Sequence, residues 1–239
     1  MKIHVLEHSP IGYPNYMDIW AKANGHQVSI TKMCESPDLA KIEDYDLLLV
    51  LGGKMSAYQE EEFPWLRTEK EYIRKAISSN KFVLGICLGS QLIAEVIGGK
   101  VFLHEHWEIG FMPMRLTEEG KRNPFFYNIP EKFMAIEFHQ DTFSLPESAL
   151  LLASSPGCKN QAFSIGDRVI GLQFHPEITK EQAGEICEEL FENHDFSSNY
   201  IQIPEEILSN AEYFDNQGNI LCTLLENIHQ FLIENANKI

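Results

Sequence analysis

The sequence is poor in basic residues. It holds 19 lysines and arginines against 35 aspartates and glutamates, and its formal net charge at pH 7 is −16. No run of lysine or arginine interrupts this acidic excess, so the composition argues against nucleic acid or an anionic membrane as a partner. The acidic surplus by itself mainly indicates a well-solvated surface.

Long apolar runs and paired cysteines are also missing. No window approaches the roughly 20 apolar residues that cross a bilayer, and the N-terminal MKIHVLEHSP lacks the apolar segment of a secretory signal. The cysteines form no CxxC pair, which argues against zinc and dithiol exchange. We therefore expect a cytoplasmic protein with no metal, no cofactor and five reduced thiols, at Cys34, Cys87, Cys158, Cys187 and Cys222.

The chain length suits one sizeable core. With 239 residues, 44% of them hydrophobic, a single α/β domain is an ordinary size. We expect one domain over residues 1–239, with a core over about 1–193 and a helical C-terminal extension over 194–239. The stripe from Leu221 to Leu232 predicts a closing amphipathic helix, which we expect to cover the domain's own sheet rather than a partner.

Short apolar stretches alternate with helical patterns in the first half of the chain. Ile3–Leu6, Val28–Ile30 and Asp46–Leu51 read as early strands, and the third runs into two glycines. This alternation predicts an open, mostly parallel sheet flanked by helices. The middle of the chain predicts a small antiparallel β element besides, because it is rich in strand-like stretches: Val101–Leu116, Met134–Phe138 and Leu150–Ser154.

A cysteine stands where a buried strand is predicted to turn into a helix. Cys87 follows the apolar stretch Phe82–Ile86, is flanked by Gly85 and Gly89, and precedes apolar residues at helical spacing. Small residues beside the apex of such a turn let a nucleophile stand clear of the backbone, and a helix N-terminus favours the thiolate. Taken alone, the pattern also fits a buried core cysteine.

A thiolate nucleophile needs a base, and the base needs a group that holds its tautomer. His175 and Glu177 follow the predicted strand Val169–Phe174, and side chains two apart on an extended segment point the same way. A His/Glu pair at this spacing is by itself more typical of a solvated or structural pair. Together with the cysteine turn, it predicts a Cys87-His175-Glu177 triad.

Two glycines predict a third element of the site. Gly52 and Gly53 end the strand before the cysteine turn, and sites in open parallel sheets form beyond the carboxyl ends of strands. Backbone N–H groups of Gly53 and Leu88 would then form an oxyanion hole. A plain tight turn is the alternative interpretation of the two glycines.

These motifs together resemble the class I (triad) glutamine amidotransferase family. They are GG-x-x-S at Gly52–Ser56, G-x-C-x-G-x-Q at Gly85–Gln91 and Q-F-H-P-E at Gln173–Glu177. The resemblance runs from near the N-terminus to about Asn193 and implies flavodoxin-like layering. Further stretches are similar to the stand-alone GMP-synthase-like branch, to which γ-glutamyl peptidases are also similar: EEEFPWL, EIGFMP, FHQDTFSLP and SSPGCKNQAF.

The resemblance also implies roles for individual residues. Cys87 would be the nucleophile, His175 the general base and acid, and Glu177 its orienting partner. Lys54 stands where the family usually has proline, and Gln140 stands where the family often has glycine. The residues implied to hold the amino-acid end of the substrate are Gly52, Gln91, Phe138, His139 and Gln140.

Three functions remain open. The first is a glutaminase-type amidotransferase that hydrolyses glutamine through a γ-glutamyl thioester and passes ammonia to a separate synthetase or acceptor chain, because the sequence has no glycine-rich ATP-binding motif. The second is a hydrolase of γ-glutamyl peptides or amides. The third is a non-catalytic regulatory module that kept the fold.

Other patterns support the fold rather than the chemistry. Thr179 and Gln182 form a predicted capping box at the start of a helix. His104 and His106 could be a metal pair, but a surface loop is the favoured interpretation because no third ligand is evident. Asp141 is expected to cap a turn rather than to orient a substrate amine. Two tryptophans, Trp65 and Trp107, are expected to be packing aromatics.

Overall fold

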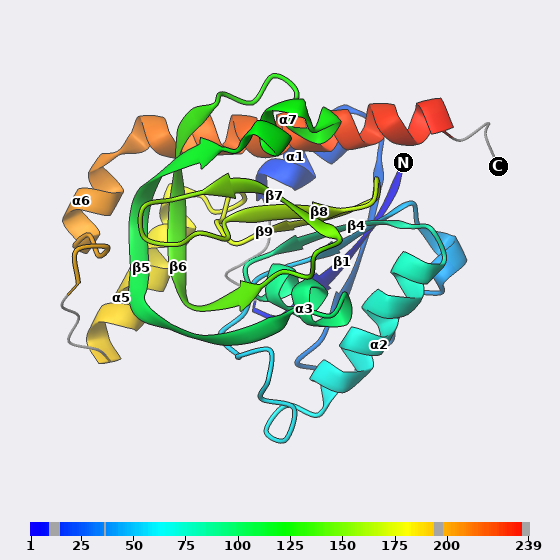
Figure 1. Ribbon diagram of the computed structural model, residues 1–239, viewed down its shortest axis with the longest axis horizontal. Coiled ribbons are helices and arrows are strands. Elements are labelled where there is room, and N and C mark those ends of the chain that lie inside the picture. Colours follow the sequence, from blue (N-terminus) through cyan, green and yellow to red (C-terminus); the bar gives the residue numbers. More distant parts are fainter. Residues whose placement is uncertain (10–14, 36, 194–197, 236–239) are drawn as a thin grey trace.

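A nine-stranded sheet forms the centre of the protein. The structure is a computed structural model that describes residues 1–9, 15–35, 37–193 and 198–235. Within them the strand order is β2-β1-β3-β4-β9-β8-β7-β5-β6 (Figure 1). The strands are β1 Lys2–Glu7, β2 Gln27–Lys32, β3 Leu47–Val50, β4 Phe82–Ile86, β5 Lys100–Leu116, β6 Lys132–Ser144, β7 Ala149–Ser154, β8 Ala162–Ile165 and β9 Val169–Leu172.

The strands from β2 to β9 in this order are parallel. β1 pairs with β2 and β3, and β4 pairs with β3 and β9. Every residue of β3, β4 and β9 is buried, as expected of parallel strands covered on both faces, which accounts for their unbroken apolar sequences. The predicted α/β fold with a mostly parallel sheet flanked by helices is confirmed.

The other edge of the sheet is antiparallel. β5 pairs with β6 along most of its length, with a register shift between Leu103 and Glu108. β6 is longer than the predicted strand Met134–Phe138. β8 was not predicted, because its four residues show no clear period of their own and are fixed by pairing with β7 and β9.

Helices cover both faces of the sheet. α1 and α7 lie on one face, and α2 and α3 lie on the other (Figure 1). The helices are α1 Asn15–Ala23, α2 Trp65–Ser78, α3 Leu88–Val96, α4 Glu118–Arg122, α5 Lys180–Asn193, α6 Pro204–Ser209 and α7 Ala211–Asn235, with short 3-10 helices at Ile42–Asp44 and Pro124–Phe126. No helix of the described residues is both long and apolar enough to cross a membrane.

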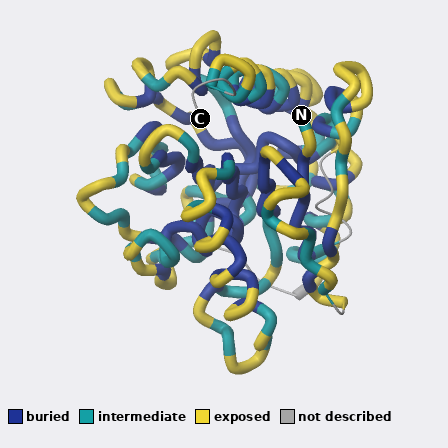
Figure 2. Tube along the Cα trace, turned by 90° about the vertical axis from the view of Figure 1, so that its right-hand side faces the viewer, coloured by how far each residue is buried: buried dark blue, intermediate teal, exposed yellow. Residues whose placement is uncertain are grey.

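Three hydrophobic clusters pack the sheet against its helices. Alternate strand residues point to opposite faces, so Leu49 packs in the core with α7 while Val50 packs in the core with α2 and α3. Figure 2 shows the resulting buried interior between exposed outer segments. Leu221 and Leu224 of α7 lie in the first core, which confirms that the closing helix covers the domain's own sheet.

Helix α5 begins as its sequence predicts. The Gln182 backbone N–H donates to Thr179 Oγ1 over 3.3 Å, and the Thr179 N–H donates to Gln182 Oε1 over 2.9 Å. These reciprocal bonds confirm the capping box. They also fix where the chain leaves the turn after β9, which carries His175 and Glu177.

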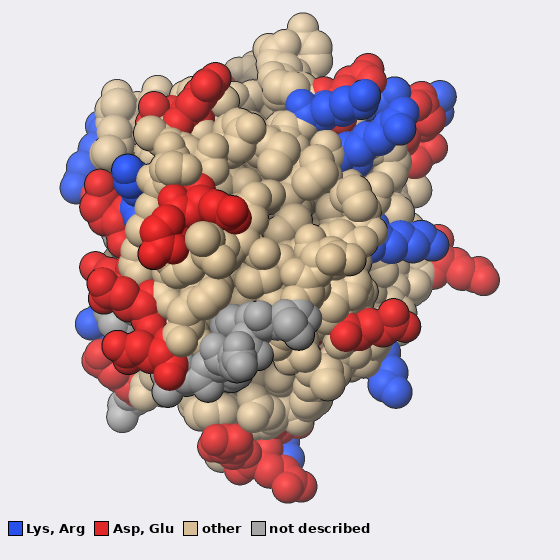
Figure 3. All heavy atoms as spheres, turned by 90° about the vertical axis from the view of Figure 1, so that its left-hand side faces the viewer, with Lys and Arg blue, Asp and Glu red and all other residues tan. Residues whose placement is uncertain are grey.

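One face of the surface illustrates the scarcity of basic residues. Viewed from the left side of Figure 1, acidic side chains follow one side of the molecule and basic ones gather mainly on the other (Figure 3). A broad area between them carries neither charge. This face therefore offers no continuous basic surface of the kind that binds nucleic acid.

Candidate active site

Cys87 occupies a strained turn between β4 and α3. Its φ is +50° and its ψ is −110°, a conformation that residues with a side chain rarely adopt. The flanking glycines are needed for packing: a Cβ on Gly89 would lie 2.0 Å from the carbonyl oxygen of Val50, and one on Gly85 would lie 2.6 Å from the carbonyl of Gly89. The start of α3 is thus pressed against β3 and β4, with Cys87 at the apex.

His175 and Glu177 form a buried pair beside this turn. His175 Nδ1 lies 2.7 Å from Glu177 Oε1, and both side chains are more than nine-tenths buried. The second ring nitrogen, Nε2, has no full hydrogen bond among the described residues, although the ring interacts electrostatically with Cys87. Catalytic hydrogen bonds are often long or poorly aligned before substrate binds.

The charges around His175 favour its protonated form. Burial alone disfavours the imidazolium, but the negative charges of Glu177 and Cys87 and the hydrogen bond with Glu177 outweigh burial. Together they raise the pKa of His175 well above its ordinary value of 6.5. The arrangement therefore favours the imidazolium form of His175.

The glycine loop after β3 lies against both groups. A Cβ on Gly52 would lie 3.0 Å from His175 Cε1 and 3.4 Å from Cys87 Cβ, so a larger residue would crowd the pair. Leu88 is the first residue of α3, and its N–H has no partner within the helix because of that position. A Cβ on Gly53 would lie 2.9 Å from Leu88 Cδ2. The two backbone segments proposed for the oxyanion hole are therefore neighbours.

Sheet topology brings the three segments together. Gly52 follows β3, Cys87 follows β4 and His175 follows β9, and these strands are adjacent in the order β3-β4-β9. All three strands are parallel, so their carboxyl ends meet at one edge of the sheet. The sequence predicts that the glycines and the cysteine lie at this edge. The strand order adds His175, because it places β9 next to β4.

A cavity of about 560 Å³ opens over this edge, within the range of small-molecule sites. Trp107 lines it and also packs against a hydrophobic cluster of β5 and β6, as expected of a packing aromatic. Besides Leu88, whose contribution would be a backbone N–H, the residues predicted for the site all line the cavity: Gly52, Gly53, Cys87, Gln91, Phe138, His139, Gln140, His175 and Glu177.

The residues implied to hold the amino-acid end differ in what they can offer. Gln91 donates its side-chain amide to the carbonyl of Asp141 and to Gln173 Oε1, both over 3.2 Å. His139 Nδ1 lies 3.0 Å from the carbonyl oxygen of Asp141 and its Nε2 lies 3.0 Å from Glu108 Oε2. Both side chains thus hold this part of strand β6 in place, which leaves backbone groups and the half-buried Gln140 to face the cavity.

The cluster around His139 is buried and acidic. His139 Nε2 also lies 3.3 Å from Glu137 Oε2. The side chains of Glu108 and Glu137 are at most 1% exposed. Burial, followed by the charge of Glu108, raises the pKa of Glu137 well above its ordinary value of 4.5. Among the described residues, the contacts of Glu137 with His139 and Gln161 fall short of well-aligned hydrogen bonds. Its surroundings therefore favour the protonated, neutral form of Glu137.

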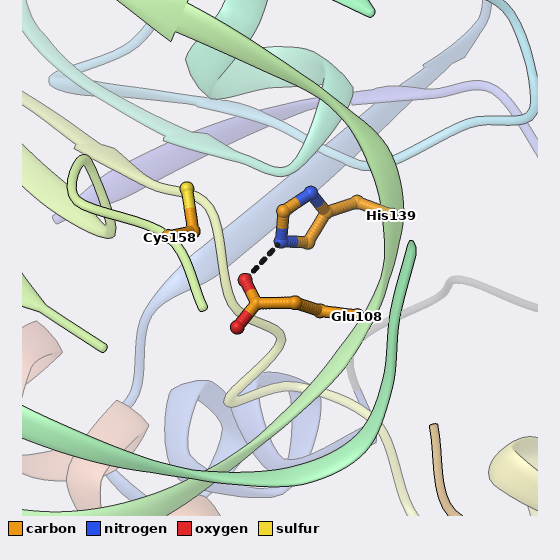
Figure 4. Close-up of side chains that lie close together, drawn as sticks. All are labelled: Glu108, His139 and Cys158. Atoms are coloured by element: carbon orange, nitrogen blue, oxygen red, sulfur yellow. Dashed lines mark hydrogen bonds and ion pairs between the residues drawn. The ribbon is translucent and has the colours of Figure 1, made fainter. Parts of the chain in front are cut away.

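Three side chains of this cluster could approach a metal ion. One ligand atom each of Glu108, His139 and Cys158 lies within 4.8 Å of the others (Figure 4). The same atoms are already engaged, however: Glu108 accepts from Gln161 over 2.9 Å, and Cys158 Sγ lies 3.3 Å from Thr142 Oγ1. We therefore interpret the group as a hydrogen-bonded network that supports strand β6 where it borders the cavity.

The pair His104 and His106 belongs to a strand rather than to a surface loop. Both residues lie in β5, in the irregular stretch between Leu103 and Glu108, so the expected loop is wrong. His106 Nε2 bonds the Gly157 carbonyl over 3.0 Å and its ring stacks on Tyr200. These contacts account for His106 through packing and need no metal ligand.

Two residues beside the site escaped sequence reasoning. His8 Nε2 lies 2.9 and 3.0 Å from the two oxygens of Glu69, and His8 Nδ1 lies 3.2 Å from the carbonyl oxygen of Gly52. Trp65 stacks on the His8 ring, with centroids 5.5 Å apart, as a packing aromatic should. No local motif marks the pair. The usable signal was that His8 directly follows β1, the neighbour of β3.

Residues 20–193 match the family model Glutamine amidotransferase class-I. The chain is 34% identical over 185 residues to the glutamine amidotransferase-like protein YfeJ of Salmonella typhimurium, covering 76% of this chain and 77% of YfeJ. It is 32% identical to a glutamine-hydrolysing GMP synthase subunit of Picrophilus torridus (77% and 93% covered) and 30% identical to γ-glutamyl peptidase 3 of Arabidopsis thaliana (74% of each).

Solved structures agree in fold. A glutamine amidotransferase from Thermotoga maritima superposes with a TM-score of 0.84 at 28% identity, covering 95% of this chain and 97% of that one. A glutamine amidotransferase from Methylobacillus flagellatus superposes with a TM-score of 0.87 at 26% identity, covering 96% and 94%.

Proposed function

The chain belongs to the class I glutamine amidotransferase family, and from this premise we propose that it hydrolyses a γ-glutamyl amide through Cys87, His175 and Glu177. The observation that carries the proposal is the meeting of a strained Cys87 with the buried His175–Glu177 pair at the carboxyl ends of adjacent strands. The favoured substrate is glutamine.

In the proposed reaction, the Cys87 thiolate attacks the γ-carbonyl carbon of the substrate. The carbonyl oxygen becomes an oxyanion that accepts hydrogen bonds from the N–H groups of Gly53 and Leu88. His175 gives its proton to the departing nitrogen, and the C–N bond breaks to leave a γ-glutamyl thioester on Cys87. His175 then takes a proton from water, and the hydroxide releases glutamate and regenerates the thiolate.

Glu177 keeps His175 ready for both steps. Its 2.7 Å contact with Nδ1 holds the proton on that nitrogen and leaves Nε2 facing Cys87. The carboxylate also stabilises the imidazolium between the steps. The other products differ with the substrate: ammonia from glutamine, or a free amine from a γ-glutamyl peptide.

The ammonia released from glutamine would pass to a separate synthetase chain. The relative from Picrophilus torridus supports this, because it is named as one subunit of a GMP synthase and a subunit implies a partner. A γ-glutamyl peptidase function is the second candidate. It is favoured by the size of the cavity and by its apolar wall of Leu103, Trp107, Ile186 and Leu190, which offers room for a leaving group larger than ammonia.

The test is to measure glutamate release by the purified protein from glutamine and from a series of γ-glutamyl dipeptides. Turnover of dipeptides well above glutamine supports the peptidase, and turnover of glutamine, alone or after a synthetase is added, supports the amidotransferase. A glutamine-like affinity label should modify Cys87 stoichiometrically, with Cys87→Ala as the control. Labelling at another cysteine, or none with no turnover, would overturn the triad and favour a binding module.

A further inference from the structure

We infer that His8 and Glu69 are positioning residues that orient the oxyanion peptide. Within the proposed thioester chemistry, on which this inference rests, they turn the peptide between Gly52 and Gly53 so that its N–H faces the Cys87 side. Neither residue lines the cavity among the described residues. They would act through the backbone alone.

The geometry of a peptide group carries the argument. In a trans peptide the C=O and the N–H point in opposite directions in one plane, and no cis peptide occurs among the described residues. His8 Nδ1 lies 3.2 Å from the Gly52 oxygen, so that oxygen is held toward His8. The Gly53 N–H of the same peptide must then point away from His8.

Contacts on the other side show where that direction leads. A Cβ on Gly53 would lie 2.9 Å both from His8 Cβ and from Leu88 Cδ2, so the loop is clamped between the histidine and the start of α3. A Cβ on Gly52 would lie 3.4 Å from Cys87 Cβ. The side of the loop away from His8 is therefore the side of the nucleophile.

Glu69 fixes the charge and the rotation of His8. One ring nitrogen of His8 contacts the carboxylate and the other contacts a carbonyl oxygen, both of which are acceptors, so the ring donates from both nitrogens as an imidazolium. Trp65 stacked on the ring limits its tilt. A cation that donates to the Gly52 carbonyl polarises the peptide and strengthens the Gly53 N–H as a donor.

Charge around His8 agrees with this state. Burial opposes protonation of His8, but the charge of Glu69 and its hydrogen bond outweigh burial and raise the pKa of His8 above 6.5. Both side chains are fully buried. A buried charged pair is costly unless its hydrogen bonds are satisfied, and here both ring nitrogens of His8 have partners.

The experiment compares two reactions of Cys87 in His8→Gln, His8→Asn and Glu69→Gln variants. The Cys87 sulfur adds to the carbonyl carbon of a γ-aldehyde analogue of glutamine. The carbonyl oxygen then becomes negatively charged and needs the oxyanion hole. Iodoacetamide alkylates the same sulfur by displacing iodide and needs no such hole. The control is His4→Gln, because His4 is a buried histidine of β1, the strand that His8 directly follows, and it contacts Ser29 and Thr31 instead.

We expect His8→Gln and Glu69→Gln to lower kcat and weaken aldehyde binding by about 10- to 100-fold, below the 10²–10³-fold loss typical of deleting an oxyanion donor outright. The alkylation rate should change less than about twofold, and His4→Gln should match the wild type. His8→Asn should retain more activity than His8→Gln, since its amide nitrogen can replace Nδ1. Glu69→Gln keeps the shape of the side chain, so it tests the inference even if the His8 variants do not fold.

Unchanged aldehyde affinity in Glu69→Gln, or an equal loss in alkylation, would overturn the inference. The second outcome would mean that the pair supports the whole site rather than the oxyanion peptide. Failure of the proposed function is separate, because it would show in the wild type as no turnover of any γ-glutamyl compound.

Discussion

Replacing Glu137 with glutamine should stabilise the protein, and increasingly so as the pH rises. The carboxyl group is fully buried and lies beside Glu108, and within the described residues its contacts with His139 and Gln161 fall short of well-aligned hydrogen bonds. Glutamine has nearly the same shape but no charge to desolvate. The substitution therefore removes a cost that the wild-type protein bears whenever this carboxyl group ionises.

The direction with pH follows from the raised pKa of Glu137. A carboxyl group whose pKa is raised by folding binds its proton more tightly in the folded state, so unfolding releases that proton at pH values above 4.5. The wild type consequently loses stability as the pH rises from 4.5 toward the folded-state pKa. The Glu137→Gln variant lacks this loss, so the two proteins should be equally stable near pH 4 and diverge above it.

The gain at pH 8 comes from ionisation alone, because the glutamine amide stays as buried as the carboxyl group. Each unit by which folding raises this pKa, up to pH 8, adds about 1.4 kcal/mol to the gain. For a chain of this length, each kcal/mol moves the melting temperature by about 2–4 °C. Urea unfolding followed by circular dichroism at pH 4, 6 and 8 gives the free energy of unfolding for each variant.

Glu108→Gln is the matched control from the same cluster. Glu108 accepts hydrogen bonds from Ser155 and Gln161 and lies 3.0 Å from His139 Nε2, so its loss of charge should destabilise the protein. No gain for Glu137→Gln at pH 8, or an equal gain at pH 4 and pH 8, would refute the reasoning.

Three further outcomes follow from the site. Cys87→Ala should leave the unfolding midpoint nearly unchanged and lower turnover by more than about 10³-fold, as measured by glutamate release. Glu177→Gln should lower kcat by about 10²–10⁴-fold and, because it removes a charge that raises the pKa of His175, shift the alkaline fall of the pH–rate profile to lower pH; an unmoved fall would contradict the pairing. Burial raises the pKa of Cys158 to about 11, so peptide mapping after brief iodoacetamide treatment at pH 8 should find Cys158 unmodified.

Sequence patterns predicted much of the fold because they are local. The apolar run Phe82–Ile86 reads as a strand buried on both faces, and the glycines beside Cys87 predict the sharp turn that the backbone makes. The capping box at Thr179 marks the start of α5. Each of these features depends on residues within a few positions of one another, so the sequence expresses them directly.

Local sequence patterns do not show which distant side chains meet at the site. His8 meets Glu69 across 61 positions, and Glu108 meets His139 across 31. β8 and the irregular stretch of β5 that holds His104 and His106 likewise depend on pairing between strands.

The sequence by itself therefore determined most of the strands, turns and helices that short-range periodicity and sterics specify, while β8 and the full length of β6 depend on pairing. It also predicted which chemistry-bearing side chains end those segments, Cys87 and His175 among them. The tertiary structure alone decided that β9 lies beside β4 and that His8 lies under the Gly52 carbonyl. Strand order and register place groups that are distant in the chain within hydrogen-bonding distance, and no periodicity in the sequence records that arrangement.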